Sequence, residues 1–124
     1  MQFTFQILVG LAGLMLLGLG IMSMFAPRKM VGNFALEPIG TVGLSTIRSV
    51  IGGLFLASVA LITVGLAMEQ TLGFVAVAIL LGAVVAGRVV GIVVDGFDKA
   101  VVPPLLVEVV IIAILLAAHT QLSA

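Results

Sequence analysis

The fold is decided by residues 3–25, FTFQILVGLAGLMLLGLGIMSMF, a run of 23 residues in which no side chain is charged. A helix of about 20 mostly apolar residues crosses a hydrocarbon core of roughly 30 Å. The run ends at Pro27, Arg28 and Lys29, which combine a helix stop with basic side chains suited to a headgroup boundary. A cleaved secretory signal is the alternative, but no Lys or Arg precedes the run and another apolar stretch follows. Residues 3–25 are therefore predicted to be a membrane span.

The composition of the whole chain points the same way. Of 124 residues, 63% are hydrophobic and 8% are charged, and the mean hydropathy is +1.48. Ordinary soluble domains carry about 25% charged residues, so a water-soluble globule or a disordered chain is excluded. Five basic residues against five acidic ones disfavour nucleic-acid binding, and the absence of cysteine excludes a disulfide scaffold. The continuous apolar runs also lack the alternation of a membrane β-barrel.

Three more apolar runs follow the first, with short polar connections between them. In the first connection, residues 26–40, glycine, asparagine and proline favour a loop that lies along the membrane surface. Glu69 and Gln70 end the second run, and the residues from Asp95 to Lys99 form a polar turn after the third. We predict an all-α integral membrane bundle, a single domain of residues 1–124 with short loops, no soluble domain and four spans at 3–25, 41–68, 71–94 and 101–120.

The basic residues of the connections predict the orientation. Arg28, Lys29 and Lys99 all lie in the connections after the first and third spans, and no Lys or Arg marks the side of the two termini. Cytoplasmic loops carry an excess of basic residues. We therefore expect loops 26–40 and 95–100 to face the cytoplasm and both termini to lie outside.

Small residues recur at every fourth position in the second and third spans, a spacing that lets two helix backbones approach closely. Such stripes are typical of helix–helix contact, although glycine is common in membrane helices generally. The sequence does not decide whether the neighbouring helix belongs to the same chain or to another copy. The stripes are Ser45, Ser49, Gly53 and Ala57 in the second span and Ala83, Gly87 and Gly91 in the third.

Three charged residues lie inside apolar spans: Arg48, Arg88 and Glu108. Each costs about 2.5–3.5 kcal/mol at the bilayer centre on insertion scales, so each needs a partner, water or a function. Their positions within the spans place all three roughly 10 Å below the same interface at 1.5 Å per residue. We expect Glu108 to bridge one or both guanidinium groups, with Asp95 near the mouth of the site. Arginine suits this role because its planar fork binds a carboxylate through two parallel hydrogen bonds.

Three interpretations of this charged level remain. The charges form a self-satisfied structural network, with the arginine side chains reaching toward the interface. Alternatively, the arginines bind an anionic lipid headgroup or a small anion from the cytoplasmic side. In the third interpretation the protein is a small transporter or channel for an anion or proton, with Glu108 as the relay.

An enzyme is not expected. The chain has no Cys and no Tyr, and its single histidine, His119, lies at the opposite end of the last span from the charged level. One imidazole completes neither a nucleophile–base pair nor a metal site, so we predict no catalytic residue, no metal and no cofactor. His119 is better explained as an interfacial residue.

Two motifs resemble a known family. They are Ile47-Arg48-Ser49-Val50-Ile51-Gly52-Gly53 and Gly87-Arg88-Val89-Val90-Gly91 followed by Asp95-Gly96, and Glu108 in the last span accompanies them. Over nearly the whole chain the sequence resembles the bacterial family DUF4345, a domain of unknown function in small four-helix membrane proteins. The resemblance implies four membrane helices and importance for Arg48, Arg88, Asp95 and Glu108, but no activity. We expect the protein to lie in the cell inner membrane.

Small multidrug exporters have a similar length and number of spans. They rely on a glutamate in the first helix, and residues 3–25 contain no acidic residue. We therefore expect a structural, accessory or ligand-binding membrane protein whose partners are the lipid bilayer and either further copies of itself or a larger membrane complex.

Overall fold

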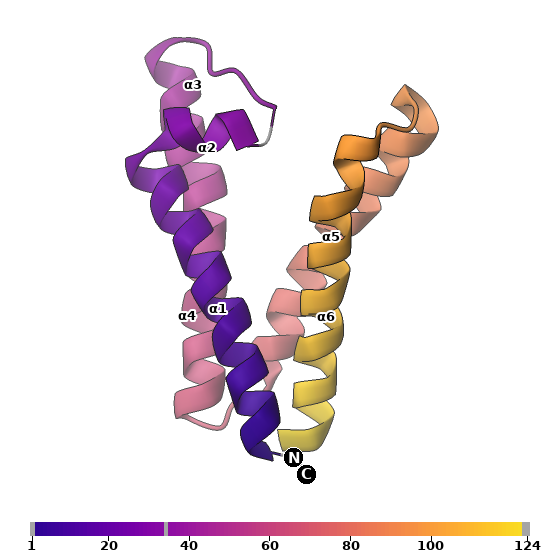
Figure 1. Ribbon diagram of the computed structural model, residues 1–124. Helices are drawn as coiled ribbons and strands as arrows, with labels where there is room; N and C mark the ends of the chain where they lie inside the picture. The colour runs from indigo at the N-terminus through magenta and orange to yellow at the C-terminus, as the bar shows by residue number, and fades with distance from the viewer. Residues whose placement is uncertain (1, 34, 123–124) are drawn as a thin grey trace. The chain divides into compact units, whose positions relative to one another are not determined.

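The computed structural model describes residues 2–33 and 35–122, and this part of the chain contains helices but no strand. Four of its helical segments are long and apolar enough to cross a membrane: Gln2–Phe25, Gly40–Ala67, Leu72–Asp95 and Lys99–Leu122. The all-helical class with four long apolar helices is thus confirmed. The elements, shown in Figure 1, are α1 (Gln2–Phe25), α2 (Pro27–Asn33), α3 (Gly40–Thr46), the π-helix η1 (Ile47–Gly52), α4 (Gly53–Ala67), α5 (Leu72–Asp95), the 3₁₀ turn η2 (Lys99–Val101) and α6 (Val102–Leu122).

The first connection corrects one expectation. The sequence predicted a loop throughout residues 26–40, but Pro27–Asn33 is the short helix α2. Pro27 ends α1 and also starts α2, because a proline needs no N–H partner in the first helical turn. The Ala26 carbonyl accepts hydrogen bonds from the backbone N–H groups of Lys29 and Met30. Met30 is fully buried, so its apolar side chain holds the short helix against the protein.

The helices form two compact units. The first, which we call the α1–α4 unit, comprises residues 10–63, and the second, the α5–α6 unit, comprises residues 1–9 and 64–124.

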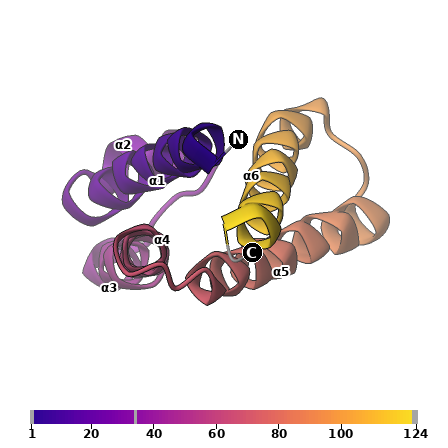
Figure 2. The same ribbon diagram turned by 90° about the horizontal axis from the view of Figure 1, so that it is seen from below.

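In the α1–α4 unit, glycines bring α1 close to the helix formed by η1 and α4. A Cβ atom added at Gly20 would lie 2.8 Å from a methyl group of Leu56, and one added at Gly52 would lie 3.1 Å from the backbone nitrogen of Met24. Leu16 and Ile62 are almost completely buried. The two helices therefore lie side by side, as both Figure 1 and Figure 2 show.

In the α5–α6 unit, the two helices are closest at the start of α5 and the end of α6. The buried side chains of α5 lie between Phe74 and Leu81, and those of α6 between Ile111 and Ala118. From there the helices diverge toward the turn that connects them (Figure 2). Gly65 at the end of α4 belongs to the same core, because a Cβ atom there would lie 2.6 Å from the buried ring of Phe74.

Much of the apolar surface is left exposed by the chain itself. Between 11% and 33% of the most apolar window of each long helix is buried inside the protein. Ile79, Val93 and Val94 are 67–79% exposed. Soluble monomers rarely expose apolar surface on this scale, and such exposure is consistent with a membrane protein.

Candidate functional site

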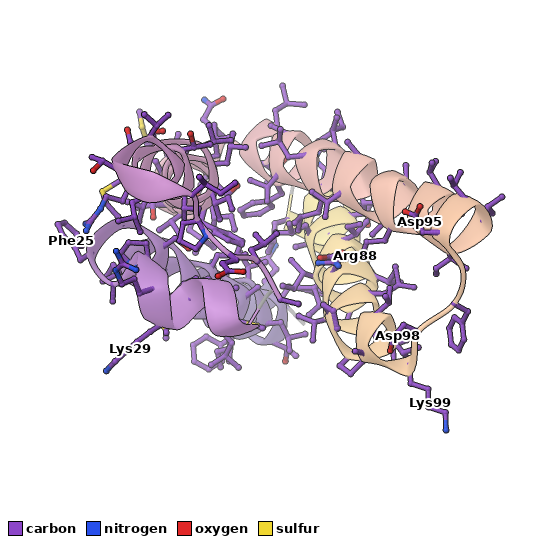
Figure 3. The ribbon with its side chains drawn as sticks, turned by 90° about the horizontal axis from the view of Figure 1, so that it is seen from above. Phe25, Lys29, Arg88, Asp95, Asp98 and Lys99 are labelled. Carbon is purple, nitrogen blue, oxygen red and sulfur yellow. The ribbon has the colours of Figure 1, made fainter. Side chains whose placement is uncertain are left out.

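Arg88 of α5 and Glu108 of α6 form an ion pair. The Arg88 Nε atom lies 2.9 Å from both Glu108 carboxylate oxygens, and the Arg88 Nη2 atom lies 2.7 Å from Oε1. The side chains are 27% and 13% exposed, so both are largely withdrawn from the surface. Figure 3 shows Arg88 between the two helices. The predicted pairing of Glu108 with an arginine is therefore confirmed for Arg88.

The position of this pair follows from the geometry of the hairpin. Arg88 lies two helical turns beyond Leu81, the last buried residue of α5, and Glu108 lies three residues before Ile111, the first buried residue of α6. The pair thus lies where the apolar contact has ended and the helices begin to diverge. A long arginine side chain can bridge such a gap, and its guanidinium group forms short charge-assisted hydrogen bonds. The pair neutralises itself and ties the two helices together.

Asp95 does not join this pair. It is the last residue of α5, it is exposed, and among the described residues it forms no ion pair. The helix ends there because Gly96 adopts a φ of 101°, a conformation that side chains disfavour. In the following turn Asp98 accepts a hydrogen bond of 2.9 Å from the backbone N–H of Ala100. Figure 3 shows Asp95, Asp98 and Lys99 toward the connecting turn.

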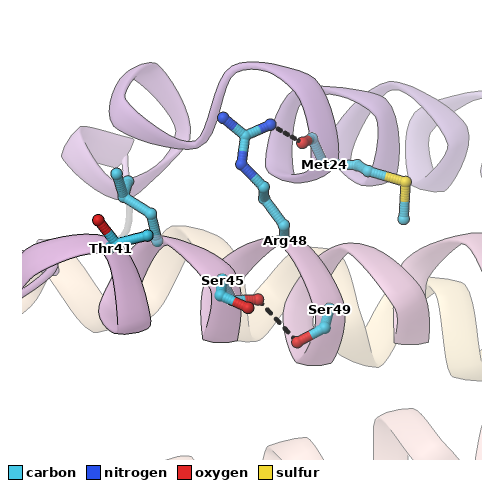
Figure 4. Close-up of a pocket in the computed structure, with 6 residues that line it drawn as sticks. Met24, Thr41, Ser45, Arg48 and Ser49 are labelled. Atoms are coloured by element: carbon cyan, nitrogen blue, oxygen red, sulfur yellow. Dashed lines mark hydrogen bonds between the residues drawn. The ribbon is translucent and has the colours of Figure 1, made fainter.

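Arg48 has different surroundings, within the α1–α4 unit. Its Nη1 atom donates a hydrogen bond to the backbone carbonyl of Met24 in α1 (Figure 4). The last four carbonyls of a helix have no partner within that helix, and Met24 is in the last turn of α1. Arg48 therefore caps the end of α1, where a positive charge also complements the helix dipole. That Arg48 lies at one level with Arg88 and Glu108 stays a prediction.

Arg48 lies within η1, a π-helix that sequence reasoning missed. Single-turn π segments are rare and frequently mark functional sites. No change in hydrophobic period indicates this element in the sequence. Gly52, the last residue of η1, forms the close contact with the Met24 backbone.

The Arg48 side chain lines an open hollow of about 450 Å³. In its wall the Ser49 hydroxyl donates a hydrogen bond of 2.7 Å to the Ser45 carbonyl, whereas the hydroxyls of Thr41 and Ser45 have no hydrogen-bond partner among the described residues. The hollow is lined by Met24, Thr41, Leu44, Ser45, Arg48 and Ser49 (Figure 4).

Within each unit, the close helix contacts do not involve the predicted packing stripes. Gly53, Gly87 and Gly91 have no atom within 4 Å of an added Cβ. The remaining stripe residues, Ser45, Ser49, Ala57 and Ala83, are exposed. The close contacts within each unit instead involve Gly20, Gly52 and Gly65. That the stripes contact another helix, in this chain or in another copy, stays a prediction.

His119 of α6 contacts Thr71 at the start of α5. Its Nδ1 atom lies 3.0 Å from the Thr71 hydroxyl, and Thr71 is 8% exposed. This contact was not predicted, because residues 71 and 119 are brought together only when α5 and α6 form a hairpin. It gives the histidine a structural partner.

Comparison with family models matches residues 4–119 to one family, whose description is Domain of unknown function (DUF4345). Searches of the curated proteins and of the solved structures give no match. The match covers nearly the whole chain and includes Arg48, Arg88, Asp95 and Glu108. The resemblance inferred from the arginine and glycine motifs is thereby confirmed, and the chain belongs to the family DUF4345.

Proposed function

We propose that this protein is a multi-pass membrane protein without enzymatic activity, which serves as an accessory component and binds an anion through Arg48. In this proposal the Arg88–Glu108 pair is structural. The observation that carries it is the difference between the two arginines: Arg88 is neutralised by Glu108, whereas Arg48 contacts a neutral carbonyl.

The charge balance of the α1–α4 unit supports this division. Residues 10–63 contain three basic side chains and one acidic side chain, Glu37. A guanidinium group in apolar surroundings is costly unless it is paired or reaches the interface. Capping the Met24 carbonyl satisfies one of its donors but does not neutralise its charge. A bound anion would do so.

The membrane topology follows the distribution of the basic residues. We propose an inner-membrane location with loops 26–40 and 95–100 in the cytoplasm and both termini outside. The anion then enters from the cytoplasmic side, next to Arg28 and Lys29. The stripes of small residues, which do not form the close contacts within each unit, favour self-association or attachment to a larger membrane complex as the structural part of the role.

Transport of an anion or proton is the alternative function. It assigns Glu108 the role of a relay, which requires the carboxylate to exchange its partners. The contacts of both Glu108 oxygens with Arg88 favour a fixed structural pair instead.

Thermal unfolding of the detergent-solubilised protein tests the binding function. Inorganic phosphate in millimolar excess over chloride should raise the melting temperature of the wild type by several degrees, because a ligand that binds only the folded state stabilises it. The shift should disappear in Arg48→Gln and persist in Lys99→Gln, which removes an equal charge from the exposed turn of the other unit. Absence of a shift in the wild type would overturn the proposal.

Reconstitution into liposomes tests the alternative. Our proposal expects no protein-dependent flux of chloride, phosphate or protons. A flux that vanishes in a folded Glu108→Gln variant would instead establish transport.

A further inference from the structure

A second hollow adjoins the one around Arg48, within the α1–α4 unit. It has a volume of about 230 Å³ and shares Leu44 and Arg48 with the larger hollow. Its other lining residues lie at the end of α1, at the start of α2 and between these two helices. It is lined by Phe25, Ala26, Pro27, Arg28, Lys29, Leu44 and Arg48.

The two hollows together bring three cations to one place. Arg28, Lys29 and Arg48 line them, and no acidic residue does. Arg28 and Lys29 are exposed and form no ion pair or side-chain hydrogen bond with the described residues. Three like charges gathered in this way repel one another, and an anion with several acceptor oxygens relieves that repulsion.

The rest of the lining combines polar and apolar side chains. Beside the cations, the hydroxyls of Thr41 and Ser45 lack partners among the described residues. The remaining surface includes the apolar side chains of Met24, Phe25 and Leu44. The larger hollow falls within the roughly 300–1,000 Å³ of small-molecule sites, so it accommodates more than a single inorganic ion.

We propose that Arg28, Lys29 and Arg48 bind the phosphate group of an anionic phospholipid. This inference rests on the proposed anion-binding function and names its ligand. The phosphate lies among the three cations, the glycerol hydroxyls of a headgroup such as phosphatidylglycerol meet Thr41 and Ser45, and the acyl chains leave along the exposed apolar side chains.

Depth in the membrane favours a lipid over a soluble phosphate compound. Arg48 lies seven residues beyond Thr41, about 10 Å along an apolar helix at roughly 1.5 Å per residue. Arg28 and Lys29 directly follow the span Gln2–Phe25, at the level where headgroups lie. A lipid phosphate is held at this boundary by its own acyl chains, whereas a soluble phosphate must leave water to reach Arg48.

Lipid retention provides the experiment. The full chain is purified in mild detergent, incubated with equal amounts of phosphatidylglycerol and phosphatidylcholine, and analysed by native mass spectrometry. The wild type should retain phosphatidylglycerol about tenfold more strongly than phosphatidylcholine. The double variant Arg28→Gln/Lys29→Gln should lose most of this preference, and Lys99→Gln should keep it.

The double variant avoids a folding artefact, because Arg28 and Lys29 are exposed whereas Arg48 also caps α1. Arg48→Lys is a second probe, which keeps the charge but loses the guanidinium fork and should show an intermediate preference. Equal retention of both lipids by the wild type, or an equal loss in Lys99→Gln, would overturn the lipid assignment.

The outcome is separable from that of the proposed function. If inorganic phosphate stabilises the wild type through Arg48 while phosphatidylglycerol is not preferred, the protein binds a soluble phosphate compound and only the lipid inference fails. If phosphate produces no stabilisation and neither lipid is preferred, both fail.

Discussion

The Nε atom of Arg88 lies 2.9 Å from each carboxylate oxygen of Glu108 and joins α5 to α6 beyond the end of their apolar contact. The hairpin is thus held by two different interactions along its length. Near the termini of the hairpin, Phe74 and Leu115 are fully buried. Toward the connecting turn, where apolar packing has ended, the Arg88–Glu108 ion pair joins the two helices.

Removal of one member of this pair leaves the other unpaired, so the effects of removing each should not add up. Arg88→Leu or Glu108→Leu alone leaves an uncompensated charge and should lower the free energy of unfolding by about 1–3 kcal/mol. The double variant should lose less than the sum of the two. Unfolding in mixed detergent micelles, analysed as a double-mutant cycle, measures the coupling. Asp95→Asn is the control, since Asp95 forms no ion pair with the described residues. Additive losses would show that the pair contributes no coupling.

Gly65 and Gly82 should respond differently to the same substitution. Gly65→Ala places a Cβ atom 2.6 Å from the Phe74 ring and should lower the free energy of unfolding by about 1–3 kcal/mol through overpacking. Gly82 has no atom within 4 Å of that position, so Gly82→Ala should be neutral or stabilise by up to about 1 kcal/mol, because alanine favours helix. Thermal unfolding of the two variants makes the comparison, and equal effects would contradict the described packing around Phe74.

Two neighbouring glycines provide a similar test in the α1–α4 unit. A Cβ atom at Gly52 would lie 3.1 Å from the Met24 nitrogen, whereas Gly53 faces open space. Gly52→Ala should push α1 away, weaken the hydrogen bond from Arg48 to the Met24 carbonyl and destabilise the protein by about 1 kcal/mol or more. Gly53→Ala should have little effect on the melting temperature. A larger loss of stability in Gly53→Ala than in Gly52→Ala would contradict the contact described between Gly52 and α1.

The contact between Thr71 and His119 should contribute about 1 kcal/mol to stability. Thr71→Val removes the hydroxyl from a position that is 8% exposed and leaves the His119 Nδ1 atom without that partner. Thr120→Val is the matched control, because the exposed Thr120 hydroxyl bonds to the Ala117 carbonyl of its own helix. Chemical denaturation of both variants should reveal a clear loss only for Thr71→Val.

Substitution of the small-residue stripe of α5 tests whether the protein self-associates through this stripe. Gly87 and Gly91 have no neighbouring atom within 4 Å of an added Cβ, so side chains introduced by Gly87→Leu/Gly91→Leu start in open space. If another copy packs on this stripe, the double variant should dissociate the oligomer, because bulky side chains keep the helix backbones apart. Light scattering in detergent measures the mass of the particle. A wild type that is already monomeric, or an oligomer that persists in the variant, would assign the stripe to lipid.

Sequence reasoning succeeded where a property depends on a single segment. The four long apolar helices follow from local composition, and α5 ends at Asp95, one residue beyond the predicted 94. The pairing of Glu108 with an arginine could also be anticipated, because an isolated charge in an apolar span requires a partner.

The sequence missed features that arise from contacts between segments. Proline and glycine in residues 26–40 favoured a loop, but burial of Met30 stabilises α2. The regular spacing of Gly53 and Gly87 indicated helix contacts, yet within each unit the close approach occurs at Gly52 and Gly65. Spacing shows which residues share a face of a helix, but it does not show which face a neighbour covers.

The sequence by itself determined four apolar helices and the family, because length, apolarity and motif spacing are written along the chain. The tertiary structure alone decided that Glu108 meets Arg88, that Arg48 caps α1 at Met24, and that Arg28, Lys29 and Arg48 line adjoining hollows. The physical reason is that any charge in an apolar helix needs a partner, whereas the identity of that partner depends on how the helices pack.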